Sequence, residues 1–256
     1  MIFKTALLSF VQSITEFLPI SSSGHLLLVE KIFGFKEFDL SFNILIHLAS
    51  GLALVIFFFR EWVDIFKETK INFINSLFFK IIIGSIPALF LGLVLKKTEP
   101  PFWQSEYIVI SNLIVFGVVL LLADTIKGRE SIKELKTWKA LLIGVGQALA
   151  LVPGVSRSGI TISIALFLGL SRKESARFSF LLAAPAILAA NILEFSNFEA
   201  RSSMFNYYIF GFILTFILSY LTIWWLLKYL ERNRLWPFSV WRFIVALITL
   251  VLIFIR

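Results

Sequence analysis

Two short polar segments interrupt apolar stretches that are each too short to cross a membrane. Residues 5–18 are largely apolar, and residues 26–35 resume the apolar pattern after a turn with Pro19 and three consecutive serines. At about 1.5 Å per residue, a helix over residues 5–18 would reach only about 21 Å, whereas a span needs about 20 apolar residues. We therefore expect a re-entrant helical hairpin, whose irregular turn must be buried in protein or line a cavity.

The second polar segment repeats the first at an offset of 135 residues. Glutamine, serine and glycine occupy matching places in the two segments. The matched pairs are Gln12 and Gln147, Ser21 and Ser156, Ser23 and Ser158, and Gly24 and Gly159. A second hairpin is predicted over about 139–151 and 157–170, turning at Pro153 and Gly154. Two copies of one polar element, each in an apolar half, indicate one site that is built from two sides.

The remaining chain is apolar enough for six membrane spans. It is 59% hydrophobic and only 16% charged, whereas soluble domains carry roughly 25% charged residues. The runs are long and do not alternate, which favours helices over a transmembrane barrel. Spans are predicted at about 42–59, 77–96, 106–124, 175–194, 205–228 and 238–255, with Pro87 and Pro185 as candidate kinks.

The predicted fold is an all-α integral membrane protein with an inverted-topology repeat. Each half contains one re-entrant hairpin and three spans, and an odd number of spans turns the second half upside down relative to the first. The halves cover about 1–125 and 139–256 of a single membrane domain over 1–256, and a charged loop over 124–139 joins them. Inverted repeats with broken helices that meet near the midplane are a known way to build a site inside a bilayer.

Most lysines and arginines lie in the loops on one side of this predicted topology, and Arg242 counts with that side. Cytoplasmic loops carry the excess of positive charge in membrane proteins. The charged 124–139 loop is therefore expected in the cytoplasm, and both termini outside. The net charge of +8 is explained by this orientation, so no nucleic-acid partner is expected.

Glu16 is the acid of the first polar turn. A carboxylate at membrane depth is costly unless it has a partner. Gln12 lies four residues earlier, on the same helix face. The two side chains could hold one hard divalent cation, Mg²⁺ or Ca²⁺, together with water and substrate oxygens. Alternatively, Gln12 orients Glu16 through a hydrogen bond.

The serines of both turns precede a predicted helix start. Capping of the helix explains any one serine, but a helix N-terminus with hydroxyls and free N–H groups is also a cradle for anions. The predicted binding residues are Ser21, Ser23, Gly24, Ser156, Arg157, Ser158 and Gly159.

Three further side chains could carry chemistry. His25 follows the serines and is a candidate base, acid or nucleophile, while His47, in the middle of a span, is interpreted as structural. Arg157 is interpreted as the only arginine within a buried motif, and its planar guanidinium suits a phosphate. The competing interpretation is a structural ion pair between Arg157 and Glu16.

The paired motifs resemble the two signatures of the undecaprenyl-diphosphate phosphatase family, also called the bacitracin-resistance family. The residues are Gln12-x3-Glu16 with Ser-Ser-Ser-Gly-His, and Pro153-Gly-Val-Ser-Arg-Ser-Gly159, and segments around Gly84 and Phe178 are also similar. The resemblance covers nearly the whole chain. Many members have two glutamates in the first motif, whereas this chain has Gln12, which shifts weight onto Glu16.

The resemblance implies hydrolysis of undecaprenyl diphosphate to the monophosphate and inorganic phosphate, in the bacterial inner membrane, on a site open to the outer face. Such an enzyme recycles the lipid carrier of cell-wall synthesis and confers bacitracin resistance. Glu16, Ser22, His25 and Arg157 would be the catalytic residues, with Ser22 or His25 as nucleophile or a water attacking directly. The implied partners are the lipid diphosphate and membrane lipids, and a homodimer is left open. A flippase or transporter on the same repeat, and a binding protein without turnover, are the rival functions.

Overall fold

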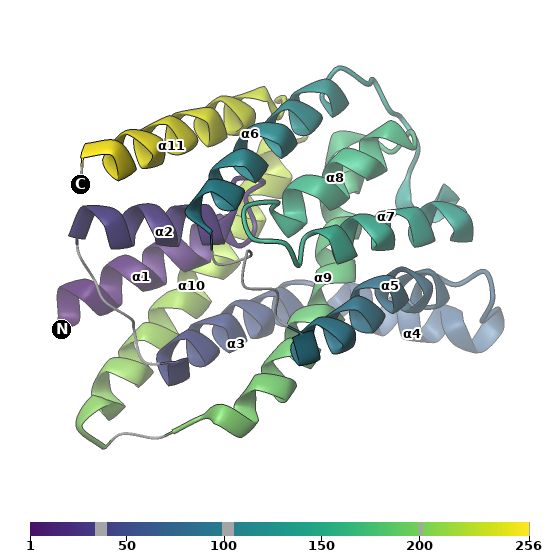
Figure 1. Cartoon of the computed structure of the whole chain (residues 1–256). Helices are drawn as coiled ribbons and strands as arrows, with labels where there is room; N and C mark the ends of the chain where they lie inside the picture. Colours follow the sequence, from purple (N-terminus) through teal and green to yellow (C-terminus); the bar gives the residue numbers. More distant parts are fainter. Residues whose placement is uncertain (34–39, 99–104, 200–201, 256) are drawn as a thin grey trace.

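The computed structural model describes residues 1–33, 40–98, 105–199 and 202–255, and its regular structure there is helical. The ribbon shows long helices that run side by side, with the N- and C-termini at the same end of the molecule (Figure 1). Some predictions fall outside the described residues. These are positions 34–35 of the first hairpin and the basic residues Lys36, Arg201 and Arg256.

Six helices within the described residues are long and apolar enough to cross a membrane, which confirms the prediction of a helical membrane protein with six spans. Their ends differ from the predicted ends by at most three residues. They are α3 (Leu40–Phe57), α5 (Leu77–Thr98), α6 (Glu106–Ala123), α9 (Arg172–Glu194), α10 (Phe205–Tyr229) and α11 (Trp236–Ile255). Pro87 lies inside α5 and Pro185 inside α9, and each helix continues through its proline.

Two pairs of shorter helices occupy the places of the predicted hairpins. They are α1 (Ile2–Thr15) with α2 (Ser22–Phe33), and α7 (Thr137–Leu149) with α8 (Arg157–Phe167). Within each pair a proline in the connecting turn lacks the N–H that a helix needs and restricts the residue before it. The first turn contains Pro19 and the second contains Pro153. We name residues 16–21 the first turn and residues 150–156 the second turn.

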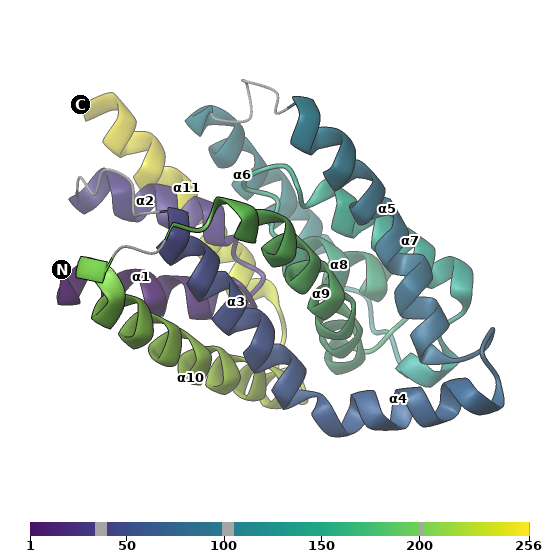
Figure 2. The ribbon, with the colours of Figure 1, turned by 90° about the horizontal axis from the view of Figure 1, so that it is seen from below.

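The short helices pack against long helices of both halves. Helix α1 lies along α10, α2 packs on α11, α7 lies along α5, and α8 packs between α6 and α9, as the two views show (Figures 1 and 2). Helices α5 and α7 pack backbone against backbone at Gly84 and Gly144. A Cβ atom on Gly144 would lie 2.1 Å from the carbonyl oxygen of Gly84, so the glycines allow backbone to touch backbone.

A helix that was not predicted, α4 (Phe59–Ile71), follows α3 at the end of the molecule opposite the termini. No element was predicted for residues 60–76, because this stretch is charged and too polar to span a membrane. Glu61 of α4 accepts a hydrogen bond of 2.9 Å from Arg177 of α9, which ties the helix to the core. Burial raises the pKa of the Glu61 carboxyl, and the Arg177 guanidinium opposes that rise.

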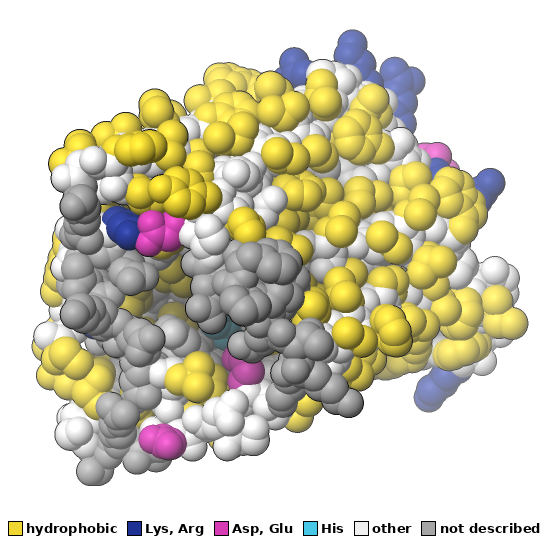
Figure 3. All heavy atoms as spheres, viewed as in Figure 1, with side chains coloured by type: hydrophobic (Ala, Val, Ile, Leu, Met, Phe, Trp, Pro, Cys, Tyr) yellow, Lys and Arg dark blue, Asp and Glu magenta, His cyan; other side chains and the backbone are white. Residues whose placement is uncertain are grey.

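The surface separates into an apolar belt and a basic end. Most of the Lys and Arg side chains on the face in Figure 3 gather at the end away from the termini, and hydrophobic side chains cover the middle. Arg242 is an exception that the sequence analysis placed wrongly. It was counted with the basic loops, but its side chain is fully buried, at 0% exposure. The remaining loop charges still favour the same side.

Candidate active site

A cavity of about 570 Å³ lies where the two turns meet. Its polar lining comes from both turns and from the helices around them, and α9 adds Asn191 and a second carboxylate, Glu194. The polar lining includes Glu16, Ser22, Ser23, His47, Ser156 and Arg157. Its apolar wall comes from the second halves of α5 and α9, with Leu89, Leu93, Pro185 and Ile187 among the residues. The cavity therefore has a polar floor, formed by the residues of the two turns, and an apolar side wall.

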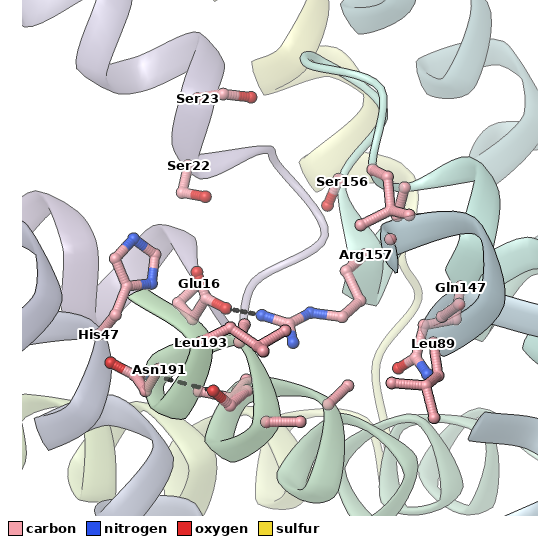
Figure 4. A pocket seen from close by; sticks show the side chains of 18 of the residues that line it. Glu16, Ser22, Ser23, His47, Leu89, Gln147, Ser156, Arg157, Asn191 and Leu193 are labelled. Atoms are coloured by element: carbon pink, nitrogen blue, oxygen red, sulfur yellow. Dashed lines mark hydrogen bonds and ion pairs between the residues drawn. The ribbon is translucent and has the colours of Figure 1, made fainter. Parts of the chain in front are cut away.

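Glu16 and Arg157 meet across the cavity floor (Figure 4). The Arg157 guanidinium donates a hydrogen bond to Oε1 of Glu16, and the pair forms a salt bridge between the two turns. The Glu16 side chain is 4% exposed and that of Arg157 is 24% exposed. The carboxylate is thus held in the wall, while part of the guanidinium still faces the cavity.

Gln12 supports the acid from behind. Its Nε2 donates to Oε2 of Glu16 at 3.0 Å and lies 3.1 Å from Nδ1 of His47. This is the orienting hydrogen bond that the sequence analysis considered as the alternative to a metal site. Gln12 is fully buried and does not line the cavity.

Each turn ends in a serine with left-handed backbone. Ser21 has a φ of 75° and Ser156 a φ of 73°, and no other non-glycine residue of the described chain has a positive φ. This conformation is strained for a residue with a side chain, and such strain persists only where the surroundings impose it. The Oγ of Ser156 accepts from Gly159 N at 3.2 Å, and that of Ser21 from Gly24 N at 3.4 Å. Both predicted helix caps are therefore present.

Hydrogen bonds also link each turn to the start of the helix that follows the other turn. Gly154 N donates to Ser23 Oγ at 2.9 Å, and Ser158 Oγ donates to the carbonyl of Leu18 at 2.9 Å. Five predicted site residues do not line the cavity and lie in the structure that surrounds it. They are Gln12, Gly24, His25, Ser158 and Gly159.

The two histidines occupy places opposite to those expected. His47, interpreted from the sequence as structural, lines the cavity beside Glu16. His25 lies outside the cavity lining, and both of its ring nitrogens have partners. Trp241 Nε1 donates to its Nε2 at 2.7 Å, and its Nδ1 lies 2.8 Å from the carbonyl oxygen of Ser21. Since Nε2 accepts, Nδ1 carries the proton and donates.

Sequence reasoning missed Gln147 as a lining residue, although the repeat had paired it with Gln12. Gln147 lines the cavity and is 2% exposed. Neither its Nε2 nor its Oε1 has a hydrogen-bond partner, and an unpartnered buried amide costs roughly 1–3 kcal/mol. The signal that could have found it was its place in the polar repeat, on the helix face that precedes the turn.

The residues around Glu16 partly fit a divalent cation. No group of three or more His, Asp or Glu side chains in the described chain could hold a metal, so the protein alone offers no cage. The buried Oε1 of Gln12 has no partner, and the Glu16 carboxylate retains lone pairs beyond its two hydrogen bonds. One carboxylate with substrate phosphates is a usual way to bind Mg²⁺, so this donor set fits a cation that arrives with a phosphate.

Known proteins match this sequence over almost the whole chain. The family model described as "Bacitracin resistance protein BacA" matches residues 5–248. A protein of Elusimicrobium minutum named undecaprenyl-diphosphatase is 38% identical, with 97% of this chain and 96% of the relative covered. Relatives with the same name are 35% identical in Alteromonas mediterranea, over 99% of both chains, and 34% identical in Marinobacter nauticus, over 96% of both. The chain belongs to the BacA bacitracin resistance family.

Proposed function

We propose that this protein hydrolyses undecaprenyl diphosphate to undecaprenyl phosphate and inorganic phosphate. The bond between the bridging oxygen and the terminal phosphorus breaks, and water supplies the new oxygen of the released phosphate. The relatives named undecaprenyl-diphosphatase and the family match support this activity. The reaction would recycle the lipid carrier and confer bacitracin resistance, while nothing supports the alternative of a flippase or transporter.

One observation carries the proposal: a half-buried guanidinium and two capped helix starts face a cavity that has an apolar side wall. A diphosphate suits the polar floor, because guanidinium groups and helix N-termini both bind phosphate oxygens. The wall of α5 and α9 suits a polyprenyl chain. Transfer of a phosphoryl group depends mainly on positioning and on stabilising charge on the oxygens, which this floor can supply.

The proposed roles follow the lining of the cavity. Arg157 binds the diphosphate and stabilises the charge of the transition state, and Ser156 and Ser21 hold the helix starts toward it. Ser22 lines the cavity and is the candidate nucleophile, with direct attack by water as the alternative. His25 stays a prediction as acid, base or nucleophile, although its contacts do not favour it. His47 is the histidine that we place beside the reacting groups as general acid or base.

A divalent cation, Mg²⁺ or Ca²⁺, remains a prediction. Glu16 and the amide oxygen of Gln12 would hold it together with phosphate oxygens. When bound, it would neutralise negative charge on the diphosphate.

The inverted repeat is proposed for the architecture, with halves of about 1–125 and 139–256. The packing supports it: α1 on α10 corresponds to α7 on α5, and α2 on α11 corresponds to α8 on α6. The two pairs of short helices would be re-entrant hairpins. The basic end would face the cytoplasm of a bacterium, with both termini outside the inner membrane and the cavity open to the outer face. A homodimer also remains a prediction, tested by the mass of the protein in detergent.

The test is phosphate release from undecaprenyl diphosphate by purified protein in detergent. A hydrolase releases phosphate there, whereas a transporter has no two compartments to act between and a binding protein leaves the lipid intact. Arg157→Ala serves as the matched control, because it removes the group that faces the diphosphate. Equal release by both proteins, or none by either, would contradict the proposal.

A further inference from the structure

Arg242 of α11 is a buried cation whose partners are all backbone oxygens. Its side chain is fully buried, and no carboxylate of the described residues accepts from it. Burying a charge without a counterion is costly, and a guanidinium that lost these hydrogen bonds would be a buried charge without partners. A fold that keeps such a residue must compensate the cost with well-placed acceptors.

The acceptors lie in three different parts of the chain. The guanidinium donates to Pro19 O of the first turn at 3.5 Å, and to Gly154 O and Val155 O of the second turn at 3.0 and 3.2 Å. Further hydrogen bonds of 3.0 and 3.1 Å reach the carbonyls of Asn112 and Leu113 on α6. A guanidinium carries five N–H donors in a rigid planar fork, and here that fork joins both turns to one long helix.

The guanidinium lies directly behind the phosphate-suited floor. Its Nη1 lies 3.4 Å from the position that a Cβ atom on Gly159 would take, in the first turn of α8. Arg157 begins the same helix and reaches Glu16 of the first turn. The alignment of these two catalytic candidates therefore depends on how the two turns are held together.

The preceding residue reinforces the first turn. Trp241 donates to His25, and His25 donates to the carbonyl of Ser21, the residue with φ of 75°. Two consecutive residues of α11 thus hold the strained backbone that leads into α2. The Arg242 contacts lie outside the cavity lining, so the residue acts through others rather than on substrate.

We infer that Arg242 is a positioning residue for the phosphatase reaction: it clamps the two turns in the register that sets Glu16 against Arg157. This inference rests on the proposed function. A lysine at 242 keeps the charge but is a point donor without the planar fork, and it cannot join both turns and α6. The geometry therefore predicts that charge alone does not restore the function.

The experiment compares Arg242→Lys, Arg242→Met and the wild-type protein in detergent, with Arg172→Met as matched control. Arg172 also bonds a buried partner, donating to Asp124 Oδ1 at 2.5 Å and to the Asp124 carbonyl at 2.6 Å, and neither residue lines the cavity. Thermal unfolding gives the melting temperature of each protein. The kcat and KM for undecaprenyl diphosphate are then measured below the lowest melting temperature, with kcat expressed per folded molecule.

Both Arg242 variants are expected to lose about 100-fold in kcat, the cost of a misplacement of about 1 Å. KM should rise far less than kcat falls, because the apolar wall of α5 and α9, which would hold the polyprenyl chain, does not contact Arg242. Arg172→Met should lower the melting temperature and leave kcat per folded molecule unchanged. Full recovery of kcat in Arg242→Lys would overturn the clamp, as would a fall in kcat no larger than that of Arg172→Met.

Failure of both Arg242 variants to fold, while Arg172→Met folds, would also count against the inference and make Arg242 a requirement of folding. A wild-type protein without phosphate release would refute the proposed function itself. The two failures are thus distinguishable.

Discussion

At the scale of single residues, the centre of the cavity is a permanent cation bonded to a carboxylate from the other turn. The salt bridge between Arg157 and Glu16 neutralises both charges in the described structure. It also leaves part of the guanidinium open to the cavity, so a phosphate can approach it. The pair can therefore serve architecture and chemistry, and variants separate the two roles.

We expect Arg157→Ala and Glu16→Ala each to remain folded and to lose activity. The stranded partner can be hydrated from the cavity, which limits the loss of stability. Arg157→Lys should also be inactive, since an ammonium cannot bind phosphate through two parallel N–H groups. Thermal unfolding and phosphate release in detergent are the measurements.

A purely structural ion pair between Arg157 and Glu16 predicts the opposite outcome. Each single variant would then lose about 3–5 kcal/mol of stability, and the double variant would regain much of it. Unfolded single variants with a stable double variant would therefore remove the phosphate role from Arg157.

His25 and His47 have different surroundings, so we expect their alanine variants to behave differently. His47→Ala is expected to lower kcat by roughly 10²–10⁴, the usual contribution of a general acid or base, and to remove one limb of the pH–rate profile. His25→Ala should lower the melting temperature and keep the shape of that profile, because its ring bridges Trp241 and Ser21. A pH profile that changes only in the His25 variant would return the role to His25.

Glu16 and Gln12 are also the predicted ligands of a divalent cation. Chelation is expected to abolish turnover, and Glu16→Gln should nearly do so, because the carboxylate is the one acidic ligand of the predicted site. Elemental analysis of the chelated sample is the control. Full turnover in excess chelator with negligible metal content would leave Glu16 as an orienting group, held by Gln12.

At the scale of elements, the contact of α5 with α7 is set by glycines. The Gly144 position has no room for a Cβ, with the Gly84 carbonyl oxygen 2.1 Å away. Gly144→Ala should separate the helices and lower stability by about 1–3 kcal/mol, the usual cost of overpacking. Thermal unfolding in detergent measures it.

Gly92→Ala on α5 is the matched control for stability. The nearest atom to its new Cβ is Leu151 Cδ1 at 3.9 Å, and replacing a helical glycine by alanine usually stabilises by about 0.5–1 kcal/mol. Equal melting temperatures for the two variants would show that α5 and α7 can adjust without cost.

At the scale of the whole molecule, the predicted orientation can be tested because the chain has no cysteine. Lys133→Cys, in the basic loop before α7, should react with an impermeant reagent only after cells are opened. Ser203→Cys, just before α10, should react in intact cells. Both positions are exposed. Labelling of Lys133→Cys alone in intact cells would mean that the orientation is reversed.

The membrane class, the six spans and the two breaks followed from the sequence by itself. Apolar length is a local property, so it survives whatever the chain packs against. A proline alone does not decide a break, because α5 and α9 continue through Pro87 and Pro185, and the breaks fall where a proline lies near the serines of the repeated polar segment. The repeat also indicated that Glu16 and Arg157 belong to one site, and the turns do bring them together.

Only the tertiary structure decided which polar side chains face the cavity and which are enclosed. Local sequence favoured His25, which follows the serines, but packing encloses His25 behind the floor while His47 lines the cavity. The sequence places Arg242 near the start of a predicted span and counts it with the basic side, whereas the packing of α11 on α2 and α6 places its guanidinium against five carbonyls. Burial is a property of assembled helices, because a side chain loses water only when distant segments cover it.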